Sequence, residues 1–80
     1  MDTYVIRLLL QIEATRTEIE QYEKKRSNAL ADLREAGMNR NDTSVFVLEL
    51  KSLEIAIKSA LTELARLERI RDYDVPHLVR

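Results

Sequence analysis

The sequence lacks cysteine and has very little glycine, proline or aromatic residue. Its 80 residues include one glycine, one proline, three tyrosines and one phenylalanine. The lack of cysteine excludes disulfides and thiolate metal sites, and nothing in the sequence favours an oxidising compartment. The scarcity of glycine and proline, beside abundant Leu, Ala, Glu, Lys and Arg, favours helix and argues against sheet.

Long apolar runs are also lacking. The longest, around Val5 to Leu10, is interrupted by Arg7 and falls well short of the roughly 20 residues needed to span a bilayer. Asp2 lies where a signal peptide would carry positive charge, and no small-residue cleavage site follows. We therefore expect no membrane span and a cytoplasmic location.

Charge of one sign does not dominate. Thirteen basic and fourteen acidic residues give a net charge of −1, so the chain has no overall field that nucleic acid would select. The one basic run, Lys24-Lys25-Arg26, is flanked by Glu20 and Glu23. We expect no nucleic-acid partner.

The residues that usually build active sites are scarce too. His77 is the single histidine, there is no glycine-rich loop, and the Glu-x-x-His element of carboxylate metal sites in helix bundles is missing. Acidic residues occupy the outer positions of the heptads described below. We expect no enzymatic activity, no metal or other cofactor and no small-molecule substrate.

Heptads dominate both halves of the chain and predict an all-α fold, an antiparallel two-helix coiled-coil hairpin. The predicted single domain, 1–80, has a helix at about 3–36, a loop at 37–43, a helix at about 44–74 and a short tail at 75–80. The first seam consists of two columns, Val5, Ile12, Ile19, Arg26 and Leu33, then Leu8, Thr15, Tyr22, Ala29 and Ala36; the second consists of Phe46, Leu50, Leu53, Ile57, Ala60, Leu64 and Leu67.

Helix-end signals set these boundaries. Gly37 follows the last heptad position, where a left-handed residue is commonly needed. Asp42, Thr43 or Ser44 can cap the second helix, and Pro76 should end it by about Asp74.

Folding the chain back about the loop predicts a register in which large residues meet small ones. In one column Ala36 faces Phe46, and Thr15 faces Leu67. The predicted hairpin core comprises Ile12, Ile19, Tyr22, Ala29, Leu33, Phe46, Leu50, Leu53, Ile57, Ala60, Leu64 and Leu67.

Two arginines, Arg26 and Arg71, interrupt the seam. Their aliphatic stems can lie along it while the guanidinium groups reach water or a glutamate such as Glu23 or Glu54. Alternatively, they fix the register or bind an acidic group on a partner.

A second stripe without charge runs up the opposite side of the second helix, and its members are Val45, Leu48, Ser52, Ile55, Ser59 and Thr62. The first helix can cover the seam of the second helix but not the stripe on its opposite side. A chain of this size leaves much apolar surface uncovered unless it associates. Single exposed apolar residues are ordinary, but a stripe of them favours an interface with a protein partner or a second copy. The predicted interface comprises Ile6, Leu9, Leu10, Val47, Leu48, Ile55, Leu61 and Thr62.

The stretch Phe46 to Ile57 resembles the pattern aromatic-x-x-Glu-x-Lys-x-Leu-Glu-x-Ala-Ile of the YscE-like co-chaperones of type III secretion needle subunits. That resemblance implies a cytosolic hairpin that binds a tetratricopeptide-like chaperone and helps keep the needle subunit soluble before export. It also implies that Phe46, Leu53, Ala56 and Ile57 belong to the hairpin core.

Three function classes therefore remain open. The first is a co-chaperone that buries apolar surface against a larger helical chaperone carrying needle cargo. The alternative is a self-associating structural or adaptor protein in which two hairpins form a four-helix bundle. A nucleic-acid adaptor acting through such a dimer is a third, weaker possibility.

Overall fold

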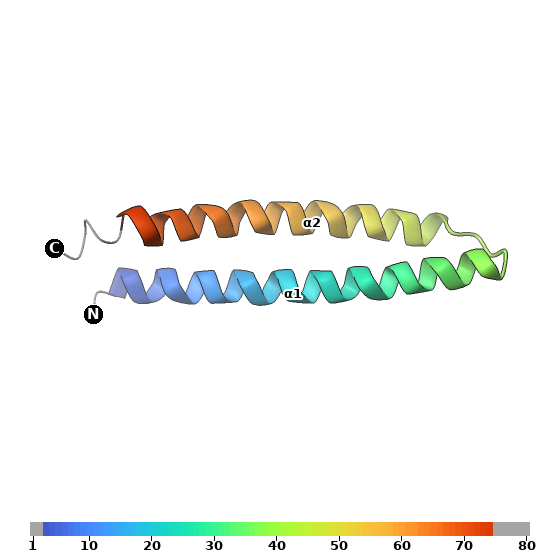
Figure 1. Ribbon diagram of the computed structural model, residues 1–80, viewed down its shortest axis with the longest axis horizontal. Helices are drawn as coiled ribbons and strands as arrows, with labels where there is room; N and C mark the ends of the chain where they lie inside the picture. The colour runs from blue at the N-terminus through green and yellow to red at the C-terminus, as the bar shows by residue number, and fades with distance from the viewer. Residues whose placement is uncertain (1–2, 75–80) are drawn as a thin grey trace.

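A computed structural model describes residues 3–74, which form one antiparallel pair of long helices (Figure 1). Helix α1 spans Thr3–Met38 and helix α2 spans Ser44–Arg69, and a π-helical turn, η1, follows at Ile70–Asp74. The described residues contain no strand. The all-α helical hairpin predicted from the heptads is confirmed.

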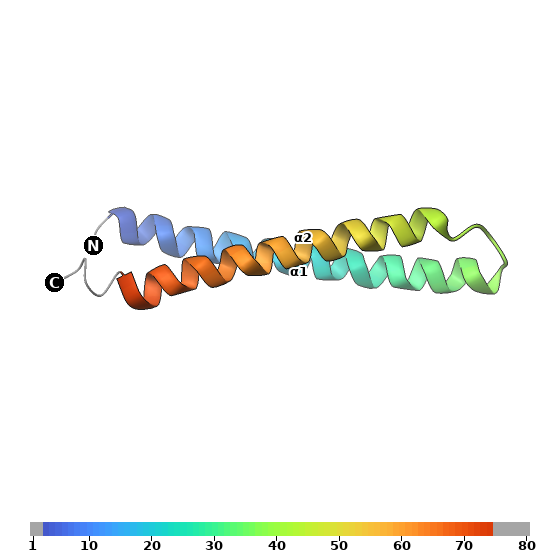
Figure 2. The same cartoon turned by 90° about the horizontal axis from the view of Figure 1, so that it is seen from above.

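The molecule is a thin rod with principal extents of 62 × 16 × 13 Å. The two helices lie side by side along almost the whole rod, and they cross at a shallow angle when seen from above (Figures 1 and 2). A heptad seam has this geometry, because a seven-residue repeat drifts slowly around a straight helix and the helices wrap to stay in contact.

The core is a single line of side chains between the helices. Burial follows the three-four spacing on both helices, because these positions recur on one face. Of the predicted core residues, Ile12, Ile19, Ala29, Leu50, Ala60 and Leu67 are buried, and Tyr22, Leu33, Phe46, Leu53, Ile57 and Leu64 are half-buried. Ala56, which the family resemblance adds, is half-buried as well.

The open end of the hairpin holds the best-packed cluster. Leu8, Ile12 and Leu67 are buried together, with Leu64 and Ile70 packed against them. The predicted register placed Leu67 opposite Thr15. In the structure Leu67 packs with Leu8 and Ile12, which precede Thr15 on α1. At the loop end Ala36 and Phe46 line one shared hollow, in keeping with their predicted pairing.

Helix α1 does not end at Gly37, as the sequence predicted, but continues through Gly37 to Met38. The left-handed residue is Arg40, with φ 56°, and no glycine has positive φ. The Asn41 N–H donates to the Ala36 carbonyl at 2.9 Å and the Arg40 N–H to the Gly37 carbonyl at 3.3 Å. These two bonds form a Schellman motif, which satisfies carbonyls that the helix end leaves open.

Helix α2 begins after Thr43, which occupies the N-cap position but makes no side-chain capping bond. Asp42, one residue earlier, takes that role, since its Oδ1 accepts a hydrogen bond from the Ser44 N–H at 3.0 Å. This bond lowers the pKa of the Asp42 carboxyl, because it stabilises the ionised form.

The second helix was predicted to reach about residue 74, and the structure divides that stretch. Regular α-helix ends at Arg69, and the wider turn η1 covers the last five described residues. Both Ile70 and Arg71 are half-buried there. Pro76, His77 and the predicted tail 75–80 lie outside the described residues, as does Asp2.

Candidate protein-binding surfaces

Within residues 3–74 no three His, Asp or Glu side chains are grouped to hold a metal ion, and no polar or charged side chain is buried. Neither helix in this range is long and apolar enough to cross a membrane. The surfaces that call for explanation are therefore apolar ones.

The outer stripe of α2, defined by Val45, Leu48, Ser52, Ile55, Ser59 and Thr62, is exposed along its whole length. Leu48 and Ile55 are 66% and 70% exposed, respectively. Seven residues separate them, so both side chains leave the same side of the helix about two turns apart. The serines and Thr62 between and beyond them add no charge.

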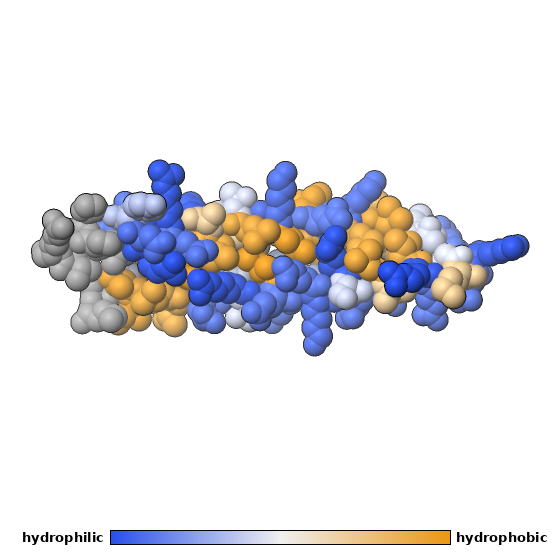
Figure 3. Space-filling model, viewed as in Figure 1, coloured by the Kyte–Doolittle hydropathy of each residue, from blue (hydrophilic) through white to orange (hydrophobic). Residues whose placement is uncertain are grey.

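A second exposed patch lies near the start of α1. Ile6, Leu9 and Leu10 are all exposed, while their neighbours Val5 and Leu8 turn into the seam. Figure 3 shows apolar surface on one face of the rod in three areas, one beside the start of α1, one over the middle of the seam and one toward the loop.

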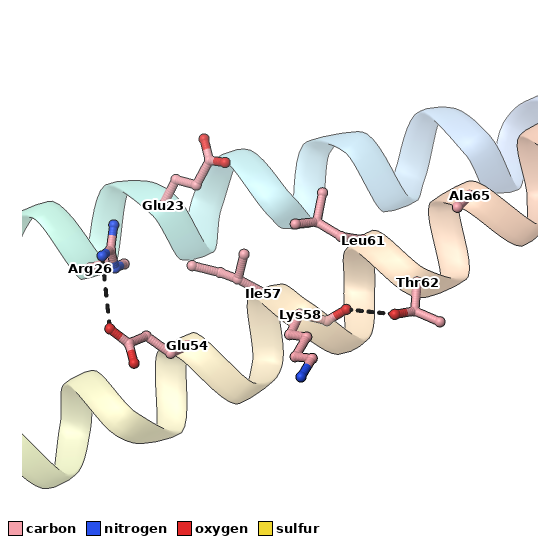
Figure 4. A pocket seen from close by; sticks show the side chains of 8 residues that line it. All are labelled: Glu23, Arg26, Glu54, Ile57, Lys58, Leu61, Thr62 and Ala65. Atoms are coloured by element: carbon pink, nitrogen blue, oxygen red, sulfur yellow. Dashed lines mark hydrogen bonds and ion pairs between the residues drawn. The ribbon is translucent and has the colours of Figure 1, made fainter.

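An open groove of about 690 Å³ lies beside the middle of the seam. Ile57 and Leu61 point from α2 toward α1, and the Arg26 side chain turns toward Glu54 (Figure 4). Arg26 occupies a seam position, yet its guanidinium pairs with the Glu54 carboxylate at 3.8 Å. No aliphatic side chain from α1 therefore covers Ile57 at this point, which is the physical origin of the groove.

The groove belongs to one flank of the hairpin, which we call the apolar flank after its four aliphatic residues; its other four members are charged. Its members occupy the position directly after one seam column on each helix: Leu9, Arg16, Glu23 and Leu30 on α1, and Val47, Glu54, Leu61 and Glu68 on α2. The Arg16 guanidinium pairs with Glu68 across the helices at 3.5 Å, and Glu23, Glu54 and Leu61 line the groove together. These contacts place both sets on the same side of the rod.

The opposite flank is polar. Its two hollows are lined largely by polar side chains, one near the loop by Asp32 and Glu35 and one near the open end by Gln11 and Arg66. Tyr22 extends its hydroxyl to this side, where Oη donates to Glu18 Oε1 at 2.9 Å. That bond to a carboxylate raises the pKa of the Tyr22 phenol, since ionised tyrosine could not donate it.

Two arginines near the end of α2 and in η1 pair with carboxylates close to them in sequence. Arg66 makes a two-bond contact with Glu63, with Nε to Oε2 at 3.0 Å, and Arg71 Nε donates to Asp72 Oδ1 at 2.8 Å. Each arginine lowers the pKa of its carboxylate partner by stabilising the charged form. Neither pair includes a residue that lines the groove.

The predicted interface residues fall into separate groups on the surface of the hairpin. Leu48, Ile55 and Thr62 belong to the outer stripe, whereas Val47 and Leu61 lie on the apolar flank. At the start of α1 only Leu9 belongs to that flank, and Ile6 and Leu10 extend the apolar surface outward. All eight predicted interface residues are exposed.

Sequence reasoning missed Leu30, which is 39% exposed on the apolar flank. The signal was present, because Leu30 follows Leu9 by three heptads. The pairing of the two helices brings Leu30 onto the same flank as Leu61 and Val47.

Comparison with protein-family models, with curated proteins and with solved structures finds no match for this chain.

Proposed function

We propose that this hairpin is a protein-binding module that presents the outer stripe of α2 to a larger helical protein. The observation that carries the proposal is the exposure of Leu48 and Ile55 on a stripe without charge. Each of these side chains would gain about 1.5–3 kcal/mol on full burial. An amphipathic helix offered in this way fits the hydrophobic grooves in which helical partners are bound.

In its finer form, the proposed role is that of a cytoplasmic co-chaperone that binds a tetratricopeptide-like chaperone and helps keep a type III secretion needle subunit soluble before export. The resemblance of Phe46–Ile57 to YscE-like co-chaperones supports this form. Phe46, Leu53 and Ile57 are half-buried in the seam, so the same stretch leaves Leu48 and Ile55 available to a partner.

The mechanism would be thermodynamic rather than chemical. A protein that binds only the native state of its partner shifts the partner's folding equilibrium toward that state. The hairpin would also cover apolar surface on the chaperone, and its own outer stripe would be buried in the same interface. Neither step needs a catalytic group or a cofactor.

The test is capture of a tetratricopeptide chaperone of a type III secretion system from the same organism, co-expressed with this chain. We expect the wild-type hairpin to co-purify with it and the double variant Leu48→Glu, Ile55→Glu to lose it, with helicity by circular dichroism unchanged. Gln21→Glu with Asn28→Glu is a matched control, because these exposed residues are also seven apart but lie on α1. Capture by the Leu48/Ile55 variant would contradict the proposal, and loss of its helicity would place these residues in the core.

A self-associating structural or adaptor protein is the second candidate, and the apolar flank favours it. Sedimentation separates the two. A dimer that persists at every concentration and binds no chaperone would favour the structural role, whereas a weak dimer or monomer that captures the chaperone favours the co-chaperone role.

A further inference from the structure

The four apolar-flank residues of α1 have a self-complementary order. Leu9, Arg16, Glu23 and Leu30 are spaced by seven, so they form one line along the helix. When that line is laid against its own reverse, Leu9 faces Leu30 and Arg16 faces Glu23. A second copy of the same helix, running the other way, would match it.

We propose that two copies of this hairpin pack with their apolar flanks together, α1 antiparallel to α1, about a two-fold axis between Ile19 and Glu20. In this arrangement Leu9 meets Leu30 of the second copy, and Arg16 meets Glu23 of the second copy. The symmetry repeats both contacts, as an isologous interface requires. This inference rests on the second candidate above, the self-associating hairpin, and it concerns a different face from the outer stripe that the co-chaperone role would use.

Other arrangements are worse electrostatically. Sliding the antiparallel helices by one heptad puts Arg16 on Arg16 in one direction and Glu23 on Glu23 in the other. A parallel pairing of α1 with α1 gives both like-charge contacts. Packing α1 on α2 lets Arg16 meet Glu68 but sets Leu30 against Glu54, which buries a charge against an aliphatic side chain.

The hairpin is already arranged for this contact. The Arg16 guanidinium is held on the flank by Glu68 at 3.5 Å, and its five N–H donors leave room for a second carboxylate. On α2, the small residue Ala65 lines the same groove and would allow close approach of the second copy. The groove over Ile57 and Leu61 would then be covered.

Cross-linking tests the geometry directly, because the chain has no cysteine of its own. Leu9→Cys and Leu30→Cys are each prepared as single variants and treated with a short thiol-reactive cross-linker, alone and mixed. We expect dimer cross-links in the mixture only, since residues 9 and 30 lie about 31 Å apart along the helix. Cross-links in either variant alone would show a parallel pairing, and none in any sample would overturn the proposal.

Charge exchange tests the contacts without new thiols. Glu23→Arg would set arginine against Arg16 twice in each dimer, and we expect the dimer dissociation constant to rise about tenfold or more. Adding Arg16→Glu to the same chain restores opposite charges and should recover the dimer. Glu49→Arg on the polar flank makes the same charge change and should have little effect. No recovery in the double variant would contradict the pairing.

One further substitution is specific to this axis. Glu20 lies on the outer edge of α1 beside the two-fold axis, so two copies of its carboxylate approach each other. Glu20→Ala should therefore tighten the dimer, and weakening would count against the axis. These outcomes do not depend on chaperone capture, so either proposal can fail while the other stands.

Discussion

Arg40 is the one non-glycine residue with a positive φ among the described residues. Its φ of 56° is left-handed, which costs a residue with a Cβ roughly 1–2 kcal/mol. Glycine would avoid that cost, yet the only glycine lies three residues earlier, inside α1. Nothing lies within 4 Å of a Cβ built on Gly37, so its site would accept alanine.

Replacing Gly37 with alanine, and separately replacing Arg40 with glycine, should each stabilise the hairpin. We expect Gly37→Ala to raise the free energy of unfolding by about 0.5–1 kcal/mol, because alanine is the better helix former. Arg40→Gly should raise it by about 1 kcal/mol by removing the left-handed penalty. Urea unfolding measures both. A loss of stability in Gly37→Ala would instead place the left-handed residue at Gly37.

At the scale of the helices, the seam has one polar defect in its middle. Arg26 occupies a seam position but pairs outward with Glu54, and an exposed pair of this kind contributes roughly 0–1 kcal/mol. An aliphatic side chain at the same position would instead cover Ile57 and close part of the groove.

Arg26→Leu should therefore stabilise the hairpin by about 1 kcal/mol, since the gain from burying leucine exceeds the loss of the ion pair. Arg34→Leu, at an exposed position of the same helix, is the control and should change the midpoint of thermal unfolding little. An unchanged or lower midpoint for Arg26→Leu would mean that the arginine stem already fills the seam.

The sequence predicted the two helices better than it predicted where they end. The heptads predicted both helices and the line of buried residues, because periodicity records which face of a helix avoids water. The C-terminus of α1 depends on hydrogen bonds from Arg40 and Asn41, and the turn η1 depends on packing against Leu8 and Ile12; neither leaves a periodic signal. The apolar flank was not recognised as one surface, and Leu30 was missed, because this flank combines residues from two helices.

For the whole molecule, acid should weaken the fold. Asp42, Glu63 and Asp72 each have a pKa lowered by a hydrogen bond, from the Ser44 backbone, Arg66 and Arg71 respectively. A carboxyl whose pKa is lower folded than unfolded contributes stability above its ordinary pKa, near 4, and loses it as pH falls through the lowered value.

Urea unfolding should thus show a lower midpoint at pH 3 than at pH 7. The triple variant Asp42→Asn, Glu63→Gln, Asp72→Asn should show a smaller difference between the two pH values, because it has lost the three linked protonations. An equal difference in the variant and the wild type would mean that other carboxyl groups govern acid stability.

Thr3 and Asp74, the two ends of the described chain, lie at the same end of the rod, with the loop at the other (Figure 1). A tensile load on both ends would therefore fall first on Leu8, Ile12 and Leu67, the cluster at that end. The helices would unzip one layer after another toward the loop, at low force, rather than shear along their full length.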